Sequence, residues 1–124
     1  MTTLRAMVDR LLMEAADDWV GIWELPWMAR SIGGAQDPEG ALNLSLQAIR
    51  ETLDNGLVEV GDVTEVGFRP WGVTSDEACH RIEREWRRFP DGPRLGDMSC
   101  WFNLTERGRE CLGESGSAQG HRRT

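Results

Sequence analysis

The sequence predicts a single α+β domain in which three helices precede a small antiparallel sheet. Two observations carry this prediction: apolar residues recur at helical spacing in the first half of the chain, and they alternate, as in strands, in two later segments. A third observation is a well-capped helical pattern between those two strands. With 124 residues, of which 40% are hydrophobic and 28% charged, the chain is long enough for one domain with a core and too short for two ordinary ones.

Two helices are predicted before residue 35. The first begins at Thr2 or Thr3 as cap, and its apolar stripe consists of Leu4, Met7, Val8, Leu11, Leu12 and Ala15. The segment from Trp19 to Ile22 is interpreted as a short strand or an extended entry into the second helix. Pro26 fits the first turn of that helix, which Gly33 and Gly34 would end.

The third helix has clear signals at both ends. Asp37 is its predicted cap, Pro38 its first residue, and Glu39 places a negative charge in the first turn, where the helix dipole favours it. Asn55 and Gly56 form the stop signal. Its apolar face, at i, i+4, i+7 and i+11, consists of Leu42, Leu46, Ile49 and Leu53.

Two strands and a closing helix follow. The segment "LVEVGDV" directly after Gly56 and the alternating segment "MSCWFNL", residues 98–104, are predicted to form a small antiparallel pair. The next segment, "LTERGRECL", reads as a short helix capped by Thr105. We therefore expect one domain over residues 1–112, and a disordered tail over residues 113–124, which are small and polar without an apolar period.

An additional helix, residues 75–89, is predicted between the two strands. Thr74 and Glu77 have the spacing of a capping box, acids occupy the first turn and arginines the last. Its expected buried stripe consists of Ala78, Ile82, Trp86 and Phe89. The connection between the strands, which contains "GFRPWGVTSDEACHRIEREW", is therefore much thicker than a simple loop.

This order of elements resembles the winged helix-turn-helix superfamily. "LDNGLVEVG" is similar to the end of a third helix that runs into the first strand of a wing, and "WFNLTERGRE" to the second wing strand with a closing helix. The wider pattern, with "FRPWGVTSDEA" and "GDMSCWFNLTERGRE", also resembles a group of actinobacterial proteins and implies no function. The resemblance implies a winged-helix core with an extra helix inserted in the wing.

The charge distribution opposes the DNA binding that is usual for this superfamily. The chain has a net charge of −7, and one arginine stands against three acids in the predicted third helix. The segment Leu57–Phe68 holds three acids and no cation, whereas affinity for DNA rests largely on cations that neutralise phosphates. If the chain is nevertheless a DNA-binding transcriptional regulator, its reading residues would be Asn43, Ser45, Gln47 and Arg50.

The sequence contains no recognisable catalytic or metal-binding pattern. His80 and His121 are its only histidines, and the three cysteines lack the paired spacing of zinc sites or disulfide frameworks. The chain has no lysine, so a phosphate-binding loop of the usual type is excluded. We expect no enzyme, no cofactor and packed, reduced thiols. The N-terminal pattern is interpreted as neither a signal peptide nor a membrane span, and a cytoplasmic protein is expected.

These observations favour a non-enzymatic module that binds a protein partner with a basic surface, an immunity- or antitoxin-like inhibitor being the specific hypothesis. A homodimer is also compatible with the sequence. Most of the six tryptophans are interpreted as filling the seam between helices and sheet, but Trp71, in the turn-like "RPWG", is taken as an interface anchor. The predicted partner-binding residues are Asp62, Glu65, Arg69, Trp71, Asp76 and Glu83.

Overall fold

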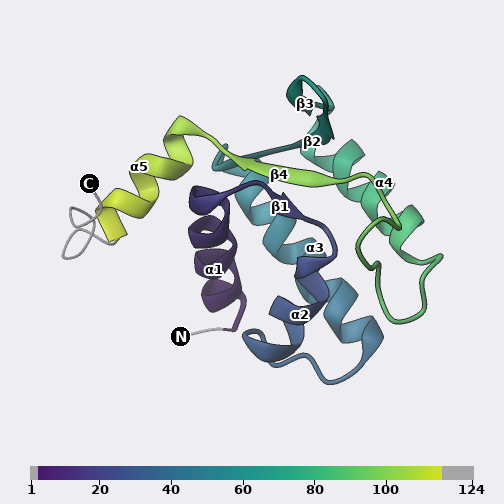
Figure 1. Ribbon diagram of the computed structural model, residues 1–124. Helices are drawn as coiled ribbons and strands as arrows, with labels where there is room; N and C mark the ends of the chain where they lie inside the picture. Colours follow the sequence, from purple (N-terminus) through teal and green to yellow (C-terminus); the bar gives the residue numbers. More distant parts are fainter. Residues whose placement is uncertain (1–2, 116–124) are drawn as a thin grey trace.

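The computed structural model describes residues 3–115, which form five helices and one four-stranded antiparallel sheet. Its α+β class is as predicted. In chain order the elements are α1 (Thr3–Asp17), β1 (Val20–Gly21), α2 (Glu24–Ser31), α3 (Pro38–Asp54), β2 (Val58–Thr64), β3 (Gly67–Pro70), α4 (Ser75–Trp86), β4 (Trp101–Leu104) and α5 (Glu106–Ser115) (Figure 1).

The predicted caps explain where three of the helices begin. The Asp37 carboxylate accepts the Gly40 N–H at 2.7 Å, and the Thr105 hydroxyl accepts the Gly108 N–H at 2.9 Å. At the start of α4 the Thr74 hydroxyl accepts the Glu77 N–H, and the Glu77 carboxylate accepts the Thr74 N–H. Each cap satisfies backbone donors that the first turn leaves without partners, and this local chemistry is readable from sequence.

The sheet has the strand order β1-β4-β2-β3, with β4 at its centre between β1 and β2. Phe102 of β4 lies opposite Val20 on one side and Val60 on the other. These side chains point to the same face, where α1, α2 and α3 cover them (Figure 1). The core forms there, from the inner face of the sheet and the apolar stripes of the three helices.

Strand β3 was not predicted, and it makes the connection after β2 a hairpin. Its four residues pair with β2 from Gly61 to Thr64, and only Glu65 and Val66 connect the two strands. Pro70 is tolerated because β3 is an edge strand, where a missing N–H costs no ladder bond. In a strand of four residues, the alternation of apolar and polar side chains is too short to distinguish a strand from a turn in the sequence.

Two helix ends differ from the prediction. α4 ends at Trp86 and not at residue 89, because Phe89 closes a turn by donating its N–H to the Trp86 carbonyl just before Pro90. α5 continues to Ser115, so residues 113–115, predicted as disordered, are helical. Once the Thr105 cap has nucleated the helix, each further residue adds a hydrogen bond. The rest of the predicted tail, residues 116–124, lies outside the described residues.

Candidate functional site

The face of the sheet opposite the three helices carries four aromatic rings, those of Trp19, Trp23, Phe68 and Trp101, and is called here the outer sheet face. The Trp23 and Trp101 rings meet edge to face, with centroids 4.8 Å apart and an interplanar angle of 88°. Trp19 and Phe68 approach to 6.3 Å. In Figure 1 the β2–β3 hairpin rises on this side of the sheet, away from α1, α2 and α3.

Two glycines make the packing on this face possible. Gly21 and Gly61 lie in register with Trp101, one on each side. A Cβ on Gly21 would lie 2.0 Å from the Trp23 ring, and a Cβ on Gly61 would lie 2.2 Å from the carbonyl oxygen of Arg69. The backbone of β3 therefore folds closely over Gly61, which is why Phe68 can reach Trp19 from the opposite edge of the sheet.

Acidic groups border the outer sheet face. Asp18 precedes Trp19 and accepts its backbone N–H, Glu59 accepts from Asn103, and Glu65 lies in the turn of the hairpin. The outward positions of the four described strands carry Glu59 and no cation. An aromatic surface with an acidic border is suited to a partner that presents arginine or lysine, because cations are attracted to indole faces and to carboxylates alike.

These aromatic residues correct the sequence interpretation of the tryptophans. Trp86 is buried, with 3% of its surface exposed, as predicted for a residue that fills the seam. Trp19 and Trp27 are 37% and 47% exposed, and Trp23 and Trp101 are half-buried. The alternation around Cys100 and Phe102 already placed Trp101 away from the core, but which rings gather beside it depends on strand register.

The six predicted partner-binding residues do not form one surface. Asp62 and Trp71 bind to other residues of the same chain. The Asp62 carboxylate accepts hydrogen bonds from the Trp71 indole N–H at 3.2 Å and from the Ser99 hydroxyl at 2.7 Å. Arg81 of α4 lies over the half-buried Trp71 ring, 3.7 Å from its centroid. This cluster joins the hairpin to α4, so Trp71 is not the exposed anchor that the sequence suggested.

The other four predicted residues lie in two places. Glu65 and Arg69 are exposed on the β2–β3 hairpin. Asp76 and Glu83 lie on α4 and form ion pairs, Asp76 with Arg50 at 3.1 Å and Glu83 with Arg87 at 2.9 Å. Of the predicted set, therefore, Glu65 lies beside the outer sheet face and Arg69 is available on the edge strand.

The face of α3 that was predicted to read DNA is flanked by α4. Arg87 pairs with Glu39 at the beginning of α3, and Arg50 near its end pairs with Asp76 at the beginning of α4, so the two helices run antiparallel. Arg50 is thus engaged by a carboxylate. Ser45 is fully buried and its hydroxyl has no hydrogen-bond partner, so it cannot contact bases; Asn43 and Gln47 are exposed.

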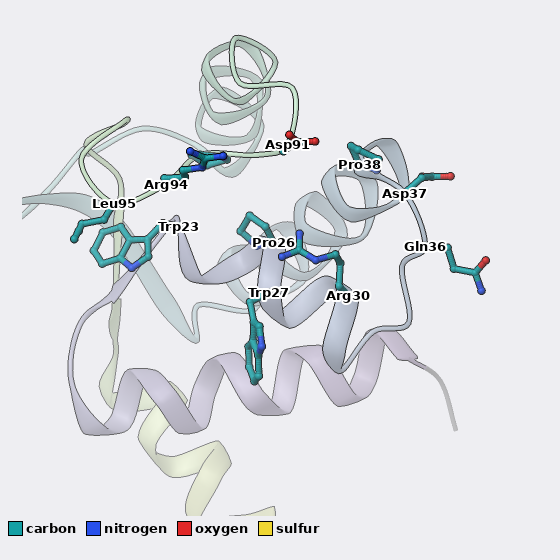
Figure 2. Close-up of a pocket in the computed structure, with 11 residues that line it drawn as sticks. Trp23, Pro26, Trp27, Arg30, Gln36, Asp37, Pro38, Asp91, Arg94 and Leu95 are labelled. Atoms are coloured by element: carbon teal, nitrogen blue, oxygen red, sulfur yellow. The ribbon is translucent and has the colours of Figure 1, made fainter.

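A hollow of about 550 Å³ lies between α2 and the loop at residues 91–95. It is called here the α2 hollow, and it is lined by Trp23, Pro26, Trp27, Arg30, Gln36, Asp37, Pro38, Asp91, Pro93, Arg94 and Leu95 (Figure 2). Figure 2 shows Leu95 beside Trp23 at one end, and Gln36 and Asp37 at the other. Sequence reasoning missed this site, although the spacing of Trp23 and Trp27 by four residues was a signal.

Buried titratable groups offer little reactivity. Burial raises the pKa of the Cys79 and Cys100 thiols, which keeps them protonated. Burial also raises the pKa of the Glu24 carboxyl, which accepts the Gly21 N–H at 3.1 Å and lies near the acids Glu14 and Asp18. Through this hydrogen bond Glu24 holds the backbone of β1 at Gly21, so the role of its carboxylate is structural.

Within residues 3–115 no group of three or more histidine, cysteine or acidic side chains is placed to hold a metal ion. Over the same part of the chain, every helix is too short or too polar to cross a membrane. No protein-family model, curated protein or solved structure matches this chain. Its functional assignment therefore rests on the surfaces described above.

Proposed function

We propose that this protein is a non-enzymatic module that binds a basic partner protein through the outer sheet face, and specifically an immunity- or antitoxin-like inhibitor. The observation that carries the proposal is the group of exposed and half-exposed aromatic rings on a sheet face that no helix covers. Tryptophan is one of the residue types enriched among the side chains that dominate binding energy in protein interfaces.

Charge supports the proposed class of partner. The net charge of −7 and the acids that border the face would steer a basic surface towards it and raise the association rate. Arginine or lysine side chains of the partner would then stack on the indoles while their charges meet Asp18, Glu59 or Glu65. An enzyme that binds nucleic acid would present such a basic surface, because cations neutralise the phosphates.

The test is affinity capture from the native cell with the wild-type chain, followed by calorimetry with the captured partner. Trp19→Ala should weaken binding at least about tenfold, as expected for an interface anchor, and added salt should weaken it further. The control is Met13→Ala, which removes an exposed apolar side chain of α1, away from this face. An acidic partner, or a partner for which Trp19→Ala and Phe68→Ala bind like wild type, would refute the proposal.

The alternative is a DNA-binding regulator of the winged-helix type. It is favoured by the order of elements, three helices followed by antiparallel strands, and by the exposure of Asn43 and Gln47 on α3. It is opposed by α4, which flanks α3, and by the ion pair that occupies Arg50. The alternative requires retention of the purified chain on random-sequence DNA at low salt, and loss of that retention in Arg50→Gln.

A further inference from the structure

The α2 hollow has a lining that one face of a helix creates. Trp23, Pro26, Trp27 and Arg30 follow one another at i, i+3, i+4 and i+7, so they form a stripe along α2. The opposite side of α2, with Leu25, Met28 and Ala29, is buried in the core. Pro26 in this stripe is itself buried, and Arg10 of α1 lies over the Trp27 ring. The loop at residues 91–95 forms the facing wall (Figure 2).

The polar groups of the α2 hollow are mostly donors without partners. Trp71 supplies the one indole N–H that has an acceptor within the described residues, so those of Trp23 and Trp27 have none. The guanidinium groups of Arg30 and Arg94 likewise form no ion pair or hydrogen bond with the described part of the chain. A ligand that pairs with these donors must offer several acceptors.

The charge and the apolar surface of the α2 hollow further restrict the class of ligand that fits it. Two arginines are balanced by Asp37 and Asp91, so the lining is neutral overall and does not select a strong anion. Its apolar part consists of the two indoles, Leu95 and Pro38, together with the rings of Pro26 and Pro93, which are themselves buried. Apolar rings that alternate with indole and guanidinium donors suit a ligand that is itself apolar, extended and rich in hydrogen-bond acceptors.

We propose that the α2 hollow binds a proline-rich segment of a partner protein in the polyproline II conformation. Such a segment makes no internal backbone hydrogen bonds, so its carbonyls are free to accept from indole and guanidinium groups. Its prolines have no N–H, so the segment hydrogen-bonds to the hollow through its carbonyls alone. Aromatic-lined grooves bind these segments well because the ligand is ordered before it binds.

This site is distinct from the outer sheet face, but the two share Trp23. Trp27 marks the hollow alone: it extends towards α1, where Arg10 lies over its ring at 5.2 Å from the centroid. Trp19 marks the outer sheet face alone. Failure of one site and failure of the other can therefore be distinguished with these two residues.

The test is a titration of the full-length chain, labelled with ¹⁵N at its indole nitrogens, with a decaproline peptide. The indole signals of Trp23 and Trp27 should shift, whereas that of Trp19 should not. Trp27→Ala should weaken binding about tenfold, and Trp19→Ala should leave it unchanged. Because Trp27 is 47% exposed, its truncation should preserve the fold; Arg94→Gln, on the facing loop, provides a second variant that should weaken binding.

Four results would overturn the proposal. The first is the absence of any shift with decaproline, and the second is an equal shift with a Gly-Ser peptide of the same length. The third is a response to polyaspartate but not to decaproline, which would identify the hollow as an anion site. Binding of decaproline that persists in both Trp27→Ala and Arg94→Gln would place the ligand elsewhere and would equally refute the assignment.

Discussion

Replacement of Gly61 by alanine tests the close approach on which the outer sheet face depends. The new Cβ would lie 2.2 Å from the Arg69 carbonyl oxygen and 2.8 Å from the Pro70 Cα, both backbone atoms, whereas ordinary contact begins at 3.4 Å. Strand β3 would have to retreat by more than an ångström, because backbone cannot change rotamer as a side chain can. The contact between Phe68 and Trp19 would open with it.

The expected loss of stability follows from overpacking at a site where the surrounding backbone leaves no room for a methyl group. Forcing one extra methyl group into such a contact costs about 1–3 kcal/mol. The upper end is expected if β3 detaches, since its four residue pairs with β2 and the hydrogen bond from the Trp71 N–H to the Val60 carbonyl would then be lost. We therefore expect Gly61→Ala to lower the free energy of unfolding by about 2 kcal/mol.

Urea unfolding followed by tryptophan fluorescence measures this loss, and hydrogen exchange of the Trp71 amide locates it. The matched control is Gly113→Ala in α5, where a Cβ would meet nothing within 4 Å; alanine in a helix costs less than glycine, so no loss is expected there. A Gly61→Ala protein that unfolds at the wild-type urea concentration with a protected Trp71 amide would refute the described approach of β3 to β2.

Three further predictions concern single buried or half-buried groups. Burial raises the pKa of the Glu24 carboxyl, so its ionised form lowers the stability of the folded protein above that pKa. Glu24→Gln should therefore unfold at a higher urea concentration than wild type at pH 7, and this gain in stability should disappear as the pH falls towards about 4. A gain in stability that persists at that pH would contradict the raised pKa of Glu24. The Ser45 hydroxyl is buried without a partner, so Ser45→Ala should raise the free energy of unfolding by about 1 kcal/mol; a loss would show that the hydroxyl is satisfied. Cys79 and Cys100 are buried with raised pKa values and should react with a thiol reagent only at the rate of unfolding, as followed by mass spectrometry of peptides; rapid labelling of the native protein would show that they are accessible.

Helix positions and caps were predictable because their causes are local. The Asp37 cap, the capping box of Thr74 and Glu77, and the Thr105 cap each join groups three residues apart. The apolar stripe of α1 repeats at helical spacing, and five of its six predicted members are buried. Interactions of this range are visible in a short stretch of sequence without knowledge of the rest of the chain.

The candidate sites were less predictable because each joins distant segments. Trp71 was taken as exposed, yet its ring lies beneath Arg81 and its N–H reaches Asp62. Arg50 was considered for DNA and is paired with Asp76, 26 residues away. Tryptophan combines a large apolar ring with a polar N–H, so its residue type alone does not distinguish the core from an interface.

By itself, then, the sequence determined an acidic α+β domain, the start of its main helices and the presence of a helix between its two predicted strands. Only the tertiary structure decided that β3 folds over Gly61, that α4 lies along α3, and that four aromatic rings meet on a sheet face without a helix. The physical reason is that periodicity and capping act over a few residues, whereas strand register and helix packing depend on groups that only the fold brings together. The exposed side of α2 illustrates both kinds of information. The four-residue spacing of Trp23 and Trp27 can be read from the sequence, but only the fold brings the loop at residues 91–95 opposite them to form the hollow.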